Sequence, residues 1–130
     1  DWTRSAEEMS DIIEALLTHT EMTCILNLPN QGQITNLPQD TIVETLATIS
    51  PEAITPKPSG DLPGPIGSLC RLHADVHELT VQAALNGDRD LCVQAFSLDP
   101  SSAGADFSEL GILTDELLLA NKKWLPRFFQ

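Results

Sequence analysis

The sequence predicts an α+β fold with more helix than strand, in which a small antiparallel sheet packs against three or four helices. Two short segments, 22–27 and 41–49, are rich in Thr, Ile and Val, which favour strands. The segment between them contains Pro, Gly and Asn, and it is too long for a tight two-residue hairpin. Longer segments on either side repeat apolar residues every three or four positions, as amphipathic helices do.

The first predicted helix precedes the strands. Ser5 can cap it, because the hydroxyl accepts a hydrogen bond from a first-turn amide. Glu7 and Glu8 then place negative charge at the positive end of the helix dipole. Apolar residues at helical spacing give this helix one face for the core: Met9, Ile12, Ile13 and Leu16.

A proline-rich connector, residues 50–65, follows the second strand. Proline donates no backbone hydrogen bond, so we expect an ordered connector or a short edge strand here. The sequence therefore predicts one domain, 1–130, made of an α/β lobe at 1–60 and a helical lobe at 61–130.

The helical lobe begins with the longest predicted helix, which ends at Asn86-Gly87 because glycine readily adopts the left-handed conformation. Its apolar stripe consists of Leu69, Leu72, Val76, Leu79 and Ala83. Asp88 begins the next helix, and Asp99-Pro100 ends it. The last helix is predicted over 107–124, where Lys122 and Lys123 suit a helix C-terminus.

Charge and cysteine content restrict the function. The formal net charge of −12 repels phosphate backbones and anionic membranes, so nucleic-acid and membrane partners are disfavoured. No apolar run approaches the roughly 20 residues that span a bilayer. The three cysteines have apolar neighbours and form no C-x-x-C pair, which predicts reduced, buried thiols and a cytoplasmic protein: Cys24, Cys70 and Cys92.

Two groups of polar residues on the predicted helices could carry chemistry. His73 and His77 are four residues apart, so both imidazoles lie on one helix face. The H-E-x-x-H zinc motif has this spacing, but Ala-Asp-Val stands between these two histidines. Because both histidines lie off the apolar stripe, a solvated helix face is favoured over a metal pair. Asp88-Arg89 is interpreted as a capping and ion-pair corner. No catalytic, cofactor-binding or metal-binding residue is assigned.

The loop between the strands is the candidate binding segment. Asn30, Gly32 and Asn36 lie in it, and amide side chains suit sugar hydroxyls because they both donate and accept hydrogen bonds. Glycine allows the backbone to approach a ligand closely. The same residues are also typical of an ordinary turn, so the residues alone leave both interpretations open. Arg4 can pair with a carboxylate of a ligand or, preferably, of the protein.

Several short motifs occur in a fixed order from about residue 4 to residue 128. Together they resemble the C-terminal segment of glycoside hydrolase family 4. The motifs are Arg4-Ser5-Ala6-Glu7, Asn27-Leu28-Pro29-Asn30, Asn36-Leu37-Pro38, Val43-Glu44, Gly60-Asp61-Leu62-Pro63, Leu98-Asp99-Pro100 and Asp115-Glu116-Leu117-Leu118.

The resemblance implies the C-terminal part of a lactate-dehydrogenase-like glycosidase fold, in an enzyme that uses NAD and a divalent metal such as Mn²⁺. In that family the nicotinamide oxidises the sugar at C3, a base (often Tyr or Asp) removes the C2 proton, and the leaving group is eliminated. The family's metal ligands, a Cys and a His, belong to the upstream cofactor portion. This chain has no Tyr and no G-x-G-x-x-G, so we expect the Rossmann domain to be absent, no NAD or metal to bind the chain alone, and no catalysis by the chain alone.

Two functional hypotheses follow. In the first, the chain is the substrate-side domain of a glycosidase of the branch that acts on unphosphorylated α-galactosides, α-glucuronides or α-galacturonides. Asn30, Gly32 and Asn36 would help to form the sugar pocket, and the helices would contact further copies of the protein and the missing cofactor domain. In the alternative, the chain is a free-standing scaffold or regulatory domain that kept the fold. Leu46 and Ala53 favour the alternative, since the family usually has Pro and Gly there. A histidine metal-binding module rests only on His73 and His77.

Overall fold

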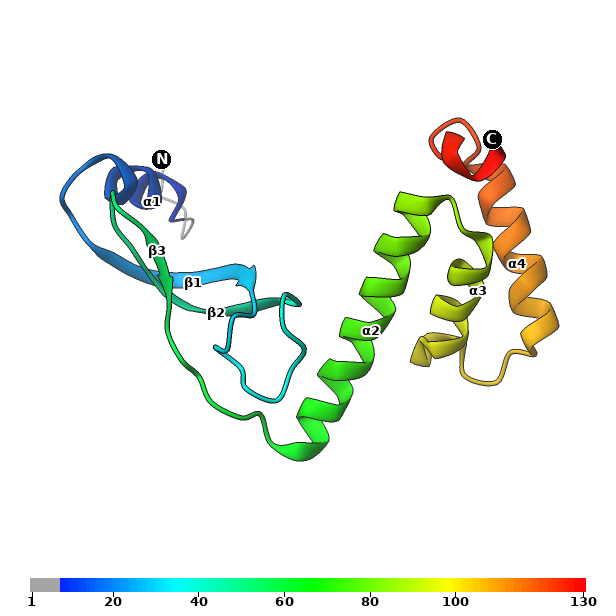
Figure 1. The fold of residues 1–130 in the computed structure, drawn as a ribbon, viewed down its shortest axis with the longest axis horizontal. Coiled ribbons are helices and arrows are strands. Elements are labelled where there is room, and N and C mark those ends of the chain that lie inside the picture. The colour runs from blue at the N-terminus through cyan, green and yellow to red at the C-terminus, as the bar shows by residue number, and fades with distance from the viewer. Residues whose placement is uncertain (1–7) are drawn as a thin grey trace, which may run out of the picture. The chain divides into compact units, whose positions relative to one another are not determined.

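The computed structural model describes residues 8–130, which form two compact units that meet in sequence at Leu62 and Pro63. The first unit contains helix α1 (Met9–Leu17) and strands β1 (Met22–Pro29), β2 (Ile42–Ile49) and β3 (Ile54–Pro56). The second contains α2 (Gly64–Asn86), α3 (Arg89–Leu98) and α4 (Phe107–Ala120), with short 3₁₀ helices η1 (Pro100–Ser102) and η2 (Pro126–Phe129) (Figure 1). The α+β prediction is confirmed.

The sheet has the order β1-β2-β3, and both pairings are antiparallel. The two predicted strands are confirmed, although β1 continues to Pro29, which lies opposite Ile42. Proline is tolerated there because β1 is an edge strand, where a missing donor interrupts no central ladder. The predicted edge segment is β3, which adds three residues to the outer side of β2 and ends the sheet.

Helix α1 covers one face of the sheet. Ala15 and Ile49 are fully buried where helix and sheet meet, next to buried Cys24. Ile12, Met22 and Leu26 pack around these three residues. The predicted apolar face of α1 was only partly right, because the side of the helix that carries Ile12 and Ala15 packs against the sheet. Three members of the predicted face are exposed: Met9, Ile13 and Leu16. Ser5 and Glu7 lie outside the described residues.

The second unit packs α3 between α2 and α4 (Figure 1). Its core consists of small and medium apolar residues: Ala74, Val76, Ala83, Val93, Ala95 and Leu110. The predicted stripe of α2 is buried at Val76 and Ala83, half-buried at its Leu72 and Leu79, and exposed at Leu69. The small residues let the helices approach closely, and the larger ones cover the edges of the contact.

Side-chain caps fix the helix boundaries of this unit. The Asp88 carboxylate accepts hydrogen bonds from two first-turn amides of α3, and Asp106 forms a capping box with Glu109 at the start of α4. The prediction that the last helix reaches residue 124 was wrong, because α4 ends at Ala120. Asn121 donates its side-chain amide to the Leu117 carbonyl at 2.9 Å, which satisfies an end carbonyl and favours the turn that follows.

The end of α2 depends on Gly87, as the sequence predicted. Gly87 adopts φ +67°, in the left-handed region, and its amide donates to the Ala83 carbonyl. The backbone of Arg127 lies against Gly87 where a Cβ would stand, and the Arg127 guanidinium donates to the Leu85 carbonyl. A guanidinium at a helix C-terminus also complements the helix dipole. The chain end is thus held on the last turn of α2.

We predict that Gly87→Ala destabilises the protein by at least about 1–2 kcal/mol, the cost of a left-handed alanine. Contact with the Arg127 backbone adds to this cost, because backbone cannot swing aside. Urea unfolding followed by circular dichroism measures the change. Gly64→Ala is the matched control, since a Cβ there meets nothing within 4 Å. Equal stabilities for the two variants would contradict the account.

The predicted Asp88-Arg89 corner is confirmed and joins α3 to α4. Arg89 donates from Nε and Nη2 to the two carboxylate oxygens of Asp115, at 2.5 and 2.9 Å, and from Nη2 to the Gly111 carbonyl at 3.0 Å. This bidentate geometry fixes the orientation of both side chains. The hydrogen bond from Arg89 holds the pKa of Asp115 below its ordinary value of 3.8.

A pKa that is lowered by folding stabilises the protein above the unfolded value, and this stabilisation is lost as the pH falls through the folded value. We therefore predict that Asp115→Asn reduces stability at neutral pH, and that the difference from wild type shrinks below about pH 4. Chemical denaturation between pH 7 and pH 2.5 measures it. Glu116→Gln, which changes the neighbouring exposed carboxylate, should not show this pattern; a constant Asp115→Asn deficit at every pH would refute the assignment.

Candidate functional site

The candidate site is the loop that connects β1 and β2. Its two ends are held together by backbone hydrogen bonds, from the Asn30 amide to the Thr41 carbonyl at 2.8 Å and from the Asp40 amide to the Asn30 carbonyl at 2.9 Å. Asp40 has φ +65°, a conformation that Asp tolerates better than most residues. The loop is therefore a closed, ordered excursion from the end of the hairpin (Figure 1).

Asn30 organises the inside of this loop. Its side chain is buried, with 1% of the residue exposed. Nδ2 donates to the carbonyls of Ile34, Leu37 and Pro38 at 2.9–3.1 Å. Oδ1 accepts from the amides of Gly32 and Ile34 at 3.3 and 3.1 Å. Both ends of the amide are thus used to replace the hydrogen bonds that the loop backbone lacks.

Gln33 is a second buried amide, which the sequence analysis did not single out. It is 3% exposed, donates from Nε2 to the Pro29 carbonyl at 2.9 Å, and accepts from the Gln31 amide through Oε1. Its backbone carbonyl accepts from the amides of Ser59 and Gly60. Gln33 and Gln31 both lie next to Gly32 in a polar loop. The sequence therefore does not indicate that Gln33 is buried and Gln31 exposed.

Asn36 joins the loop to the connector after the sheet. It is exposed, yet its side chain pairs with the Leu62 backbone in both directions, Nδ2 to the carbonyl at 2.8 Å and Oδ1 from the amide at 2.9 Å. Next to it, the Thr35 hydroxyl donates to the Asp61 carboxylate, and Ile34 forms a bridge with Gly60. The connector therefore forms one side of the site.

Two adjacent hollows lie on this framework. The larger has a volume of about 450 Å³ and is lined by Asn30, Gln31, Gly32, Ile34, Thr35, Leu37 and Gln39. The smaller, about 240 Å³, is lined by Gln31, Gly32, Gln33, Pro56 and Pro58. Gly32 borders both, with φ +105° and nothing within 4 Å of where a Cβ would stand. Of the three candidate residues, Asn30 and Gly32 line the larger hollow, and Asn36 anchors its edge.

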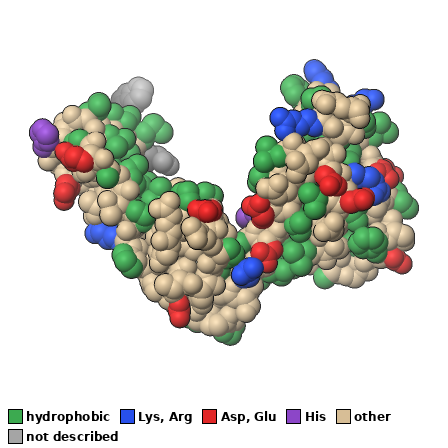
Figure 2. Space-filling model, viewed as in Figure 1, with side chains coloured by type: hydrophobic (Ala, Val, Ile, Leu, Met, Phe, Trp, Pro, Cys, Tyr) green, Lys and Arg blue, Asp and Glu red, His purple; other side chains and the backbone are tan. Residues whose placement is uncertain are grey.

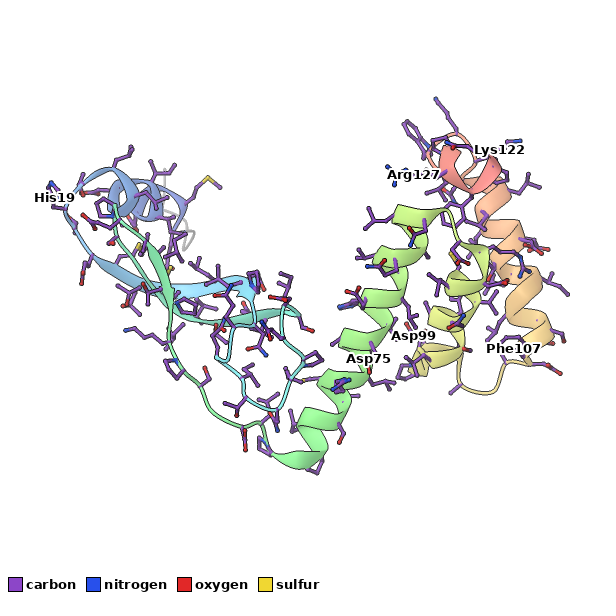
Figure 3. All side chains as sticks on the ribbon, viewed as in Figure 1. His19, Asp75, Asp99, Phe107, Lys122 and Arg127 are labelled. Atoms are coloured by element: carbon purple, nitrogen blue, oxygen red, sulfur yellow. The ribbon has the colours of Figure 1, made fainter. Side chains whose placement is uncertain are left out.

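The histidines of α2 were the other candidate. His73 and His77 are both exposed, and both interact electrostatically with the Asp99 carboxylate. Figure 3 shows Asp99 at the end of α3, the helix that packs against α2. Asp99 accepts a hydrogen bond from the Ser101 amide at 2.8 Å, and this bond is the main reason that the pKa of Asp99 is lowered. Within residues 8–130, no three His, Cys, Asp or Glu side chains are grouped as a metal ion would require.

The remaining reactive or charged residues form no second candidate site in the described part of the chain. Arg4 lies outside the described residues. All three cysteines carry free thiols, and burial raises the pKa values of Cys24 and Cys92. The groove between α3 and α4, about 550 Å³, is occupied at its polar end by the Arg89–Asp115 pair, whose donors are already used. None of the helices in the described part combines the length and hydrophobicity needed to cross a bilayer.

Residues 2–102 match the family described as the family 4 glycosyl hydrolase C-terminal domain. This chain belongs to that family. The resemblance inferred from the motifs is confirmed.

Curated relatives and solved structures agree with this assignment. The chain is 35% identical over 126 residues to an α-galactosidase of Bacillus subtilis (strain 168), covering 96% of this chain and 29% of the relative. It is 37% identical over 125 residues to an α-galacturonidase of Lachnoclostridium phytofermentans, covering 95% of this chain and 27% of the relative. The chain thus spans less than a third of the length of these relatives.

Two solved structures share the fold. The lplD protein of Bacillus subtilis is 39% identical, with a TM-score of 0.83, over 88% of this chain and 26% of that protein. The 6-phospho-β-glucosidase of Thermotoga maritima, solved with manganese, NAD⁺ and glucose-6-phosphate, is 25% identical, with a TM-score of 0.80, over 90% of this chain and 28% of that enzyme.

We predict that Asn30→Ala destabilises the first unit by about 2 kcal/mol or more, because it leaves several buried backbone groups of the loop without partners. Amide hydrogen exchange should accelerate at Ile34 in particular, since that amide donates to Asn30. Asn27→Ala, at an exposed position on β1, is the matched control. Unchanged exchange at Ile34 in Asn30→Ala would show that the side chain does not hold the loop.

Proposed function

We propose that this chain is the substrate-side domain of a glycoside hydrolase that requires NAD and a divalent metal such as Mn²⁺ and acts on α-hexosides or α-uronides. Membership of the family carries the proposal. The substrate class is supported by the names of two relatives, an α-galactosidase and an α-galacturonidase. The cofactors are supported by the Thermotoga maritima enzyme, which was solved with manganese and NAD⁺.

The loop between β1 and β2 would form one wall of the sugar pocket. In this role Asn30 and Asn36 would hold the loop in its conformation and would not bind the sugar themselves, because their side-chain amides are already bonded to the backbone. Gly32 would let a ligand approach the backbone, since nothing lies within 4 Å of where its Cβ would stand. The side chains of Gln31 and Gln39 line the hollow and make no hydrogen bond to another described residue, so they are the groups that can turn to a sugar.

The described residues of this chain do not fit the cofactors. They offer no grouped metal ligands, and the sequence has no glycine-rich phosphate-binding turn. We therefore propose that a Rossmann domain elsewhere in the polypeptide holds both NAD, which supplies the redox chemistry on the sugar, and the metal. The loop of the first unit would contribute the pocket wall, and the chain would contact that domain without catalysing the reaction alone.

The helical unit would also contact further copies of the protein. Large apolar side chains are exposed on both α2 and α4: Ile66, Leu69, Val81, Leu85, Phe107, Ile112 and Leu119. Figure 2 shows apolar side chains at several separate places on the visible face of this unit. Exposed apolar area of this kind is typical of protein interfaces. Free thiols at Cys24, Cys70 and Cys92 support a reducing, cytoplasmic location.

The first test is the intact mass of the native polypeptide in its source cells, followed by an assay of that polypeptide. We expect a mass several times the 14.1 kDa of this chain, and hydrolysis of p-nitrophenyl α-galactoside or α-galacturonide that stops when NAD or Mn²⁺ is omitted. A native mass near 14.1 kDa without hydrolysis would instead support the scaffold alternative, which the unusual Leu46 and Ala53 favour.

A further inference from the structure

We propose that Asn86 is a modification site for deamidation, and that the C-terminal strap, residues 121–130, controls when it is modified. Deamidation converts the asparagine side chain to aspartate or isoaspartate, and it requires only the chain itself and water. This site is independent of the proposed function, and the contacts that define it lie within the second unit.

The sequence has the arrangement that this chemistry needs. Asn86 stands directly before Gly87, and no other asparagine of this sequence precedes a glycine. The Gly87 backbone nitrogen can attack the Asn86 side-chain carbonyl carbon: a C–N bond forms, ammonia leaves and a cyclic imide results. Water then opens the imide at either carbonyl, which gives aspartate or isoaspartate. Glycine favours ring closure because it has no Cβ to hinder the nitrogen, and Asn86 is exposed to water.

The end of α2 holds Asn86 in a geometry that prevents the attack. Asn86 is the last residue of the helix, and its Nδ2 donates to Gln82 Oε1, one turn back, at 3.4 Å. The carboxamide is therefore directed toward the preceding turn and away from Gly87. The Gly87 N–H is also engaged, since it donates to the Ala83 carbonyl. Attack requires this hydrogen bond to break and the backbone at Asn86 to rotate out of the helical conformation.

The strap keeps this helix end closed. The Arg127 guanidinium donates to the Leu85 carbonyl, and the Arg127 backbone lies against Gly87 (Figure 3). The last turn of α2 cannot unwind without loss of these contacts. The two ends of the strap are also joined to each other, because Lys122 Nζ lies 4.8 Å from the centre of the Phe129 ring.

Modification of the folded protein is therefore limited by opening of the helix end. Where opening and reclosing are fast, the rate is the rate of the unfolded chain multiplied by the fraction of open molecules. A seated strap keeps this fraction small, and a released strap raises it. The product does not revert: isoaspartate adds a methylene group to the backbone, and aspartate adds negative charge at the negative end of the helix dipole. Release of the strap would thus be recorded in the covalent structure.

The test follows aspartate and isoaspartate formation at Asn86 by peptide mapping, in the full-length native polypeptide at mildly alkaline pH. We expect the folded wild type to be modified at least about tenfold more slowly than the same polypeptide unfolded in urea. Arg127→Ala should accelerate modification about fivefold, which corresponds to about 1 kcal/mol, the typical contribution of one hydrogen bond. Lys123→Ala is the matched control, since it removes a cation that lies over Trp124 of the strap itself, and it should leave the rate unchanged.

Phe129→Ala is a second variant, because it removes the aromatic partner of Lys122 and keeps the Arg127 side chain. It should accelerate modification less than Arg127→Ala, and it decides the question if circular dichroism shows Arg127→Ala to be unfolded. A wild type modified as fast as the unfolded chain overturns the proposal, as does a folded strap variant with the wild-type rate. Equal acceleration at the other asparagines of a folded variant also overturns it. Each of these results leaves the proposed function untouched.

Discussion

The first unit depends on one buried side-chain amide. A loop of this length between two strands leaves many backbone donors and acceptors outside the ladder, and burying them without partners costs stability. The buried Asn30 side chain supplies these partners, since its carboxamide donates to three carbonyls and accepts from two amides of the loop. Asp cannot replace it, because a carboxylate offers no donor to the carbonyls. This network positions the loop backbone at four residues: Gly32, Ile34, Leu37 and Pro38.

The network also connects loop and connector into one wall. Gln33 bonds to the end of β1 through its side chain and to the amides of Ser59 and Gly60 through its carbonyl. The Asn36 side chain bonds to the Leu62 backbone. Proline-rich segments such as 51–63 have few backbone donors of their own, so a side-chain amide from elsewhere is an efficient way to hold them. The two asparagines and Gln33 therefore hold the loop and connector in place, and in the proposed pocket Gln31, Gln39 and the backbone at Gly32 remain for a ligand.

The predictions that succeeded were those that depend on local backbone chemistry. Asp88 as a cap, Gly87 as a left-handed stop and the β-branched strands all follow from preferences of single residues or short patterns. The errors arose where tertiary contacts decide. Met9, Ile13 and Leu16 fit a helical stripe, yet the sheet contacts the Ile12–Ala15 side. Gln31 and Gln33 have similar neighbours in the sequence. Gln33 is the buried one, because its side chain bonds to the Pro29 carbonyl at the end of β1.

The overall charge of this chain is a poor guide to the surface of the candidate site. A net charge of −12 is spread mainly over helices and turns, where it favours solubility and caps such as Asp88, Asp99 and Asp106. The residues that line the two hollows carry none of this charge, since they offer amides, a hydroxyl and apolar groups, while the Asp40 carboxylate lies at the closing turn of the loop outside the lining. The neutral lining therefore reflects the local residues of the loop and not the global charge.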